Sequence, residues 1–113
     1  MHELSIVQNI LEIANNEVKK VNAHKVDQID LQIGYLAGVE MDALLFAWNA
    51  CVPETVLANA ERIIHLVPAK AKCTNCKAEF ETEDYFAQCP DCNEYLTELI
   101  QGKELKIKQL VVS

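Results

Sequence analysis

The segment Cys73-Thr74-Asn75-Cys76 is followed, after twelve residues, by Cys89-Pro90-Asp91-Cys92. Each CxxC places two thiolates on one side of a tight turn, and two facing turns form a tetrahedral sulfur cage. Zinc prefers this geometry, and four thiolates leave no open position for a substrate. The pattern therefore predicts a structural zinc site at Cys73, Cys76, Cys89 and Cys92. Tetrahedral sulfur also accepts iron, so a rubredoxin-like iron site is the rival interpretation.

The residues around these cysteines are polar and show little helical or strand periodicity. About twenty polar residues cannot build a hydrophobic core, so this segment should unfold without its metal. We expect it to be an insertion organised by the metal, over residues 71–98. Two independent redox pairs are the other interpretation, but a thioredoxin-type CxxC opens a helix within a βαβ unit, and neither pair does.

The chain before the cysteines begins with an amphipathic pattern. Apolar residues recur at helical spacing from about Glu3 to about Val21, with polar residues between them, which predicts one long helix. Residues 26–35 then alternate, with Ile29, Leu31 and Ile33 separated by polar residues or glycine. Period two predicts a strand with one face in water.

The rest of the sequence predicts one further helix and two further strands. Residues 41–52 are apolar and rich in Ala and Leu, which predicts a largely buried helix starting near Asp42 and ending before Pro53. Its Cys51 is expected to be a buried small hydrophobe. Strands are predicted at residues 63–67 and 104–112. The fold class is therefore α+β, with two helices, a small sheet and the inserted cysteine module.

Composition restricts the classes of partner and compartment. The 113 residues carry 17 acidic and 10 basic side chains, a formal net charge of −7. Nucleic-acid binding needs a basic surface, so nucleic acid is not expected as the main partner. No secretory signal and no apolar run of membrane-spanning length is found, so we expect a cytoplasmic protein that does not enter the membrane. In a reducing compartment, cysteines bind metals more often than they form disulfides.

His2 is a second candidate metal ligand because of its position. The α-amino group of Met1, the backbone nitrogen of His2 and its imidazole can converge on one ion, and the backbone nitrogen of Glu3 can complete a square. Nickel(II) and copper(II) prefer such tetragonal nitrogen ligation. The Glu3 carboxylate could add an axial or outer ligand. Taken alone, a histidine at position 2 is weak evidence for a metal site, and a frayed terminus explains it better.

Several segments together resemble one protein family. They are Met1-His2-Glu3-Leu4-Ser5-Ile6-Val7, Ile33-Gly34 followed by Val39-Glu40, Val67-Pro68-Ala69 before the first CxxC, and Gln101-Gly102-Lys103-Glu104-Leu105-Lys106-Ile107. In this order, and with the two CxxC motifs, they cover essentially the whole chain. The chain thus resembles the HypA/HybF family of nickel metallochaperones.

The resemblance implies a domain division and a ligand set. Residues 1–70 and 99–113 would form a nickel-binding α/β domain, and residues 71–98 a rubredoxin-like zinc-ribbon domain. By the resemblance, Met1, His2 and Glu3 bind nickel(II) as cargo, and the four cysteines bind structural zinc(II). Family members act with a companion nickel-insertion GTPase to deliver nickel to the [NiFe]-hydrogenase large subunit, and some also serve urease with its accessory proteins.

The chain departs from the family pattern beside the cysteines. Some members have histidines there, whereas Lys77 follows Cys76 and Asn93 follows Cys92 here. A mechanism that needs a zinc-adjacent histidine is therefore in doubt. Glu40 matches a recurring acidic position, but it is equally explained as a carboxylate favoured by a helix N-terminus.

Two other classes of protein remain as alternatives. A nucleic-acid-binding or interaction zinc ribbon would use Lys77 and the aromatic residues between the cysteine pairs, although acidic residues surround them. A rubredoxin-like electron carrier would hold iron. An enzyme is not expected, because no nucleophile–base pair, phosphate loop or open zinc site is found.

Overall fold

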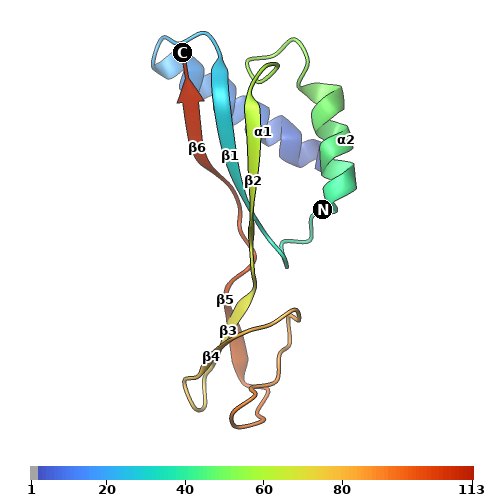
Figure 1. Ribbon diagram of the computed structural model, residues 1–113, viewed down its shortest axis with the longest axis vertical. Coiled ribbons are helices and arrows are strands. Elements are labelled where there is room, and N and C mark those ends of the chain that lie inside the picture. Colours follow the sequence, from blue (N-terminus) through green and yellow to red (C-terminus); the bar gives the residue numbers. More distant parts are fainter. Residues whose placement is uncertain (1–2) are drawn as a thin grey trace. The chain divides into compact units, whose positions relative to one another are not determined.

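The computed structural model describes residues 3–113 and contains two helices and six strands, which confirms the α+β class (Figure 1). The elements in chain order are α1 (Glu3–Lys20), β1 (Val26–Gly34), α2 (Met41–Cys51), β2 (Glu61–Val67), β3 (Lys70–Cys73), β4 (Glu79–Glu81), β5 (Thr97–Gln101) and β6 (Leu105–Val112). Neither described helix has the length and apolar character needed to cross a membrane.

The chain divides into two compact units. The helical unit contains the chain up to Leu31, together with Val39–Ile64 and Ile107–Ser113. The cysteine unit contains Gln32–Gly38 and His65–Lys106, so it reaches beyond the expected residues 71–98 on both sides. The assignment of nickel binding to residues 1–70 and 99–113, and of zinc binding to residues 71–98, stays a prediction.

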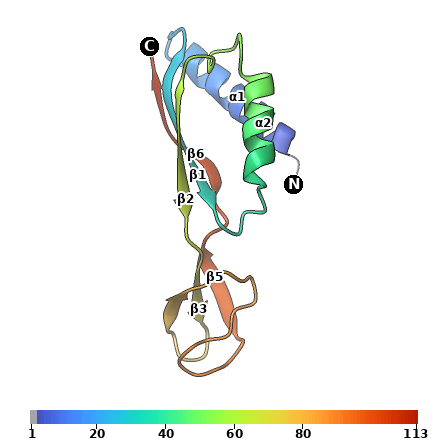
Figure 2. The ribbon, with the colours of Figure 1, turned by 45° about the vertical axis from the view of Figure 1, so that its right-hand side comes forward.

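The core of the helical unit follows the apolar periodicities of the sequence. The buried side of α1 consists of Ile6, Val7, Ile10, Ala14 and Val18, as helical spacing predicts. β1 is the central strand of a sheet of order β2-β1-β6, and its Ile29 and Leu31 are buried. The two helices pack against each other, and α1 runs across the strands (Figure 2).

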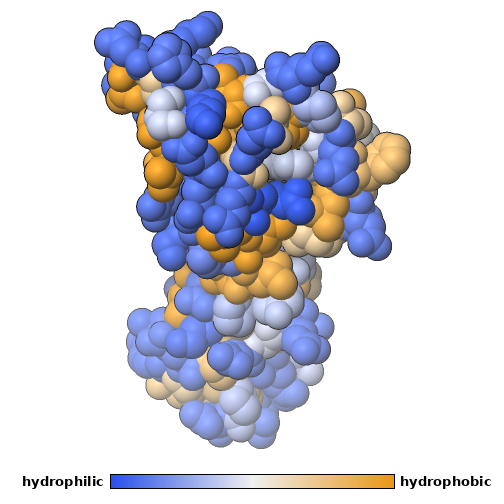
Figure 3. All heavy atoms as spheres, turned by 45° about the horizontal axis from the view of Figure 1, so that its top comes forward, coloured by the Kyte–Doolittle hydropathy of each residue, from blue (hydrophilic) through white to orange (hydrophobic). Residues whose placement is uncertain are grey.

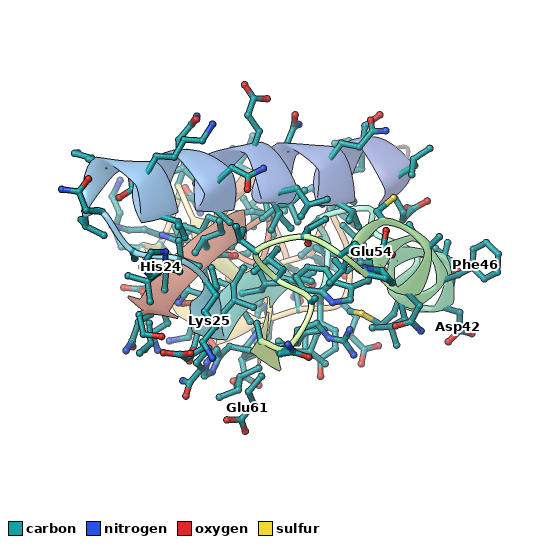
Figure 4. All side chains as sticks on the ribbon, turned by 90° about the horizontal axis from the view of Figure 1, so that it is seen from above. His24, Lys25, Asp42, Phe46, Glu54 and Glu61 are labelled. Atoms are coloured by element: carbon teal, nitrogen blue, oxygen red, sulfur yellow. The ribbon has the colours of Figure 1, made fainter. Side chains whose placement is uncertain are left out.

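Two expectations about burial in this unit were wrong. α2 is not largely buried, since only Leu44, Ala47 and Trp48 are, and Phe46 is 79% exposed. Asp42 and Phe46 point away from the rest of α2 and into solvent (Figure 4). An apolar helix without polar residues at regular spacing does not show which of its sides packs inward, because every side carries apolar residues. Cys51 is accordingly only half-buried.

The second wrong expectation concerns β1, whose predicted wet face is partly covered. Asp30 is buried and its Oδ1 accepts a hydrogen bond of 2.8 Å from the side chain of Gln28. Alternation with a period of two residues identifies which residues share a face of the strand, but not which neighbours cover that face.

The molecular surface seen in Figure 3 is mainly hydrophilic, with smaller apolar groups among the polar side chains.

α2 begins at Met41, the first residue of the predicted range, but its capping residue is not the expected Asp42. Glu40 is the N-cap: its backbone is extended, and its carboxylate accepts hydrogen bonds from the backbone N–H groups of Asp42 (3.1 Å) and Ala43 (2.7 Å). These are two of the N–H groups that no helical carbonyl can satisfy. The capping role of Glu40 therefore agrees with the explanation of this residue as a helix N-terminal carboxylate.

Replacing Glu40 by Ala is expected to lower the free energy of unfolding by about 1 kcal/mol, because both N–H groups lose their acceptor. Urea denaturation followed by circular dichroism measures this change. Glu12→Ala is the matched control, since it removes an exposed glutamate from the middle of α1. Equal stability of the two variants would contradict the capping role.

The cysteine unit contains a sheet that the sequence pattern did not predict. β3 pairs antiparallel with both β4 and β5, in the order β4-β3-β5, and Ala71 lies opposite Phe80 and Leu99. These strands lie in a segment whose sequence shows little strand periodicity. Strands of three to five residues offer at most two alternations, too few to distinguish from loop sequence.

In the cysteine unit, the backbone of the turn after β1 lies close to the backbone at Val67 and Gly102. Tyr35 N–H donates to the carbonyl of Val67 (3.0 Å), and Leu36 N–H donates to that of Gly102 (2.8 Å). A Cβ at Gly34 would lie 2.0 Å from the carbonyl oxygen of Gly102, so a side chain cannot be accommodated there without moving the backbone. The turn at residues 35–38 is thus fixed against the strands of this unit.

Candidate metal centre

The four cysteines predicted as ligands lie together in the cysteine unit. Their Sγ atoms are all within 4.8 Å of one another. The Sγ atoms of Cys73 and Cys92 are 3.5 Å apart, and those of Cys76 and Cys89 are also 3.5 Å apart. Among the residues that the structure describes, this is the only group of at least three His, Cys, Asp or Glu side chains placed to hold a metal ion.

The two CxxC motifs form turns of the same construction. In the first, Lys77 N–H donates to the carbonyl of Cys73 (3.0 Å), and in the second, Asn93 N–H donates to that of Cys89 (2.9 Å). Lys77 and Asn93 both have positive φ, 68° and 62° respectively. Each turn therefore ends with a left-handed residue directly after its second cysteine, a position that sequence spacing alone did not identify. Asparagine tolerates this conformation better than most residues.

Hydrogen bonds to sulfur supplement these turns. The backbone N–H of Cys76 donates to the Sγ of Cys73 (3.5 Å), and the amide of Asn75 donates to the Sγ of Cys92 (3.6 Å). Such donors favour the thiolate, the form of cysteine that binds metals. Asn75 is thus a supporting residue that the sequence analysis did not single out.

Hydrogen bonds from the backbone and from neighbouring side chains give two of the thiols different pKa values. A backbone hydrogen bond at Glu94, followed by the Asn75 amide, lowers the pKa of Cys92 from 9.0 to about 7. At Cys76, a backbone hydrogen bond at Ala78 acts to lower the pKa, but the thiol of Cys89 and loss of solvent outweigh it and raise the pKa to about 12. Four thiolates this close together need a cation to offset their charge.

The chemistry of the donor set fits a tetrahedral metal ion. A Zn–S distance of about 2.3 Å gives sulfur–sulfur edges of roughly 3.8 Å, close to the separations found here. Cys73 and Cys89 are buried, whereas Cys92 is half-buried and Cys76 exposed. All four sulfurs point to one another, so an ion held there would keep no position for a substrate.

Zinc affinity is expected to fall as pH falls, because zinc must displace protons from the thiols. Fewer thiolates are present at low pH, and the interval from about pH 8 to about pH 6 spans the pKa of Cys92, about 7. Competition with a zinc chelator at both pH values measures the change. An unchanged zinc affinity, after correction for the protonation of the chelator, would contradict thiolate ligation.

Of the three N-terminal candidate ligands, only Glu3 is described, and it belongs to the helical unit. Met1 and His2 lie outside the described residues. Glu3 opens α1, and its carboxylate accepts a hydrogen bond of 3.2 Å from the backbone N–H of Glu40. The first turn of α1 is thus joined to the N-cap of α2, a link between segments 37 residues apart that the sequence pattern did not show.

Comparisons with known proteins agree on one family. The family model described as "Hydrogenase/urease nickel incorporation, metallochaperone, hypA" matches residues 1–112. Proteins called "Hydrogenase maturation factor HypA" from Geobacter metallireducens and Parabacteroides distasonis are 39% and 35% identical to the chain over 112 residues. These alignments cover 99% of this chain, and 99% and 97% of the two relatives.

Two solved structures share the fold. The solution structure of the Ni metallochaperone HypA from Helicobacter pylori has a TM-score of 0.70 and 23% identity, and covers 99% of this chain and 97% of its own. A second solution structure of a HypA protein has a TM-score of 0.74 and 23% identity, and covers 100% of this chain and 97% of its own. At this level of identity the likeness concerns the fold.

Proposed function

The chain belongs to the HypA family of hydrogenase/urease nickel-incorporation metallochaperones, and from this premise we propose that it binds nickel(II) and delivers it to the [NiFe]-hydrogenase large subunit during maturation. The observation that carries the proposal is the family match over residues 1–112, which includes the N-terminal Met-His-Glu motif. In this role nickel is the cargo, and the chain itself catalyses no reaction.

Nickel would be held by Met1, His2 and Glu3. The amine and imidazole supply two nitrogens, and deprotonated backbone amides of His2 and Glu3 supply two more, which matches the square geometry that nickel(II) accepts. This ligand set requires a free amine on Met1.

The position of Glu3 at the start of α1 is compatible with a backbone ligand. The Glu3 carboxylate already accepts a hydrogen bond from Glu40 N–H. The first N–H groups of an α-helix are not needed for its internal hydrogen bonds, so the backbone nitrogen of Glu3 can bind a metal without breaking α1. The carboxylate of Glu3 joins the first turn of α1 to the N-cap of α2.

The cysteine cluster would hold zinc(II) in a structural role. The four sulfurs would bind the ion, and zinc would supply a fixed, redox-inert cross-link between the two CxxC turns. The chain would act in the cytoplasm with a companion nickel-insertion GTPase, and with urease accessory proteins where urease is the client. The seven acidic and two basic side chains of residues 71–98 disfavour the nucleic-acid-binding zinc ribbon.

Calorimetric titration of nickel(II) into zinc-loaded, untagged protein tests the proposal. We expect one nickel per chain, in addition to the zinc, with the zinc content unchanged after the titration. Nickel that displaces zinc from the cysteines, or no nickel binding beyond the zinc, would overturn the proposed cargo role.

A further inference from the structure

The cysteine unit contains a hollow of about 730 Å³ that the metal sites do not use. It lies between the turn after β1 and the loop after β4. One wall is formed by Tyr35, Leu36, Pro68 and Ala69, and the other by Glu81, Thr82, Glu83 and Asp84. All of these residues belong to the cysteine unit. We call this feature the acidic hollow.

The walls of the acidic hollow are held together by contacts within the unit. The hydroxyl of Tyr85 donates to the carbonyl of Leu36, and the ammonium of Lys103 lies 5.6 Å from the centre of the Tyr85 ring. Thr82 N–H donates to the carbonyl of Ala69 (3.0 Å), which joins the two walls a second time. A surface that is already ordered loses less entropy when it binds a partner.

The two walls differ in chemistry, and together they suit a cationic side chain. Glu81, Glu83 and Asp84 are exposed carboxylates, and no residue that lines the hollow is basic. Opposite them, the Tyr35 side chain is 64% exposed. An arginine or lysine can place its charge near carboxylates and over an aromatic ring while its methylene groups contact the apolar wall.

An exposed aromatic residue lies two positions after the last residue that lines the hollow. Phe86 directly follows Tyr85 and is 91% exposed, so its ring contributes almost nothing to the core of the cysteine unit. Large exposed aromatic side chains are typical of binding surfaces and are frequent among the residues that dominate binding energy. An occupant that combines a basic residue with apolar neighbours would therefore use both the acidic hollow and Phe86.

A metal ion fits this surface less well than a side chain. The carboxylates of the hollow do not form a group with ligand atoms close enough to hold one ion, since within residues 3–113 only the cysteines do. A guanidinium presents five N–H donors over a wider area and can bind carboxylates that are spread apart.

We propose that the acidic hollow and Phe86 form a docking surface for a protein segment in which arginine or lysine is flanked by apolar residues. The charge of the hollow is complementary to such a segment, and the exposed Tyr35 and Phe86 rings provide the apolar contacts. The proposal goes beyond nickel carriage and does not depend on it, because neither Glu3 nor any of the four cysteines lines the hollow.

A peptide titration tests this docking surface. The probe is the acetylated and amidated peptide Gly-Leu-Arg-Val-Arg-Phe-Gly, added to isotope-labelled, zinc-loaded full-length chain and followed by nuclear magnetic resonance. We expect shift changes centred on Tyr35 and residues 82–86. The same peptide with citrulline in place of both arginines keeps the shape without the charge, and we expect at least about tenfold weaker binding.

Two double variants with the same change in net charge separate local recognition from general attraction. Glu83→Gln with Asp84→Asn removes charge from the hollow and is expected to weaken peptide binding at least about fivefold. Glu17→Gln with Glu98→Gln removes as much charge from exposed positions outside the hollow and is expected to leave binding unchanged. Phe86→Ser should weaken binding while leaving the thermal stability unaltered.

Three results would overturn the docking surface. The first is equal weakening by both double variants, and the second is equal binding of the citrulline peptide. The third is a shift of the hollow resonances with protein concentration alone, which would assign the surface to a second copy of the chain. Nickel affinity measured on the same variants should stay unchanged, so failure here is distinct from failure of the proposed nickel function.

Discussion

Removal of the metal from the cysteine cluster is expected to unfold residues 70–101 of the cysteine unit while the helical unit stays folded. Between residues 65 and 106, the buried hydrophobic residues are all small: Ala69, Ala71, Cys73, Ala87 and Cys89. Alanine burial contributes little free energy, and two of these five residues are the candidate ligands themselves. Structural zinc, in contrast, contributes about 10–16 kcal/mol in zinc-finger peptides. The metal is therefore expected to be the main source of stability for residues 70–101.

The helical unit has an independent source of stability. Its fully buried side chains include Val7, Ile29, Leu44 and Leu57, and Trp48 of α2 is also buried. Nuclear magnetic resonance before and after chelation should therefore show loss of dispersed amide signals from residues 70–101 only, with those of α1 and α2 retained. Dispersed signals from residues 70–101 in metal-free protein would contradict the structural role of the metal.

A single substitution should have the same effect as chelation. Cys89→Ser removes a fully buried sulfur, and we expect it to prevent zinc retention and to expose residues 70–101 to proteases. Cys51→Ser is the matched control, because Cys51 is a free, half-buried cysteine in α2 and lies outside the cluster. Equal protease resistance of the two variants would refute the role of Cys89 as a ligand.

The second large effect is expected at the N-terminus. His2→Ala, or one residue added before Met1, should weaken nickel binding at least about 100-fold, which corresponds to about 2.7 kcal/mol or more. The first variant removes the imidazole, and the second moves the amine away from the position that closes the chelate ring. Titration of nickel into each variant measures the loss. His24→Ala is the matched control, since His24 is exposed and outside the motif.

The same ligand set predicts the direction of the pH dependence. The amine has an ordinary pKa of about 7.7–8.0 and the imidazole of about 6.5, and both must lose a proton before they bind nickel. Nickel affinity should therefore fall as the pH is lowered from about 8 to about 6. Wild-type affinity in the chain extended before Met1, or equal affinity across this interval, would exclude the terminal ligand set.

Parts of the fold that depend on long periodic patterns could be predicted from the sequence. α1 shows its apolar residues at helical spacing over five turns, and the burial of Ile6, Val7 and Ile10 follows from that spacing. The four cysteines could be predicted to converge because CxxC turns constrain their thiols locally. For the buried face of α1 and for the cysteine cluster, residues close in sequence already determine which side chains lie together.

Other features depend on contacts between distant segments and could not be predicted in this way. The exposure of Phe46 depends on which side of α2 meets α1, and the burial of Asp30 depends on what covers β1. The hydrogen bond from Glu40 N–H to Glu3 joins residues far apart in the sequence. The strands of the cysteine unit are too short to show a period, and their pairing follows from the position of the CxxC turns.

Transfer of nickel is the most direct test of the account. Zinc-loaded chain carrying one nickel would be mixed with nickel-free [NiFe]-hydrogenase large subunit and the companion GTPase, in the presence of a chelator that captures free nickel. The account predicts that nickel appears in the large subunit from the wild-type chain and not from the His2→Ala variant. Nickel remaining with the chain or the chelator, or equal transfer with the His2→Ala variant, would contradict it.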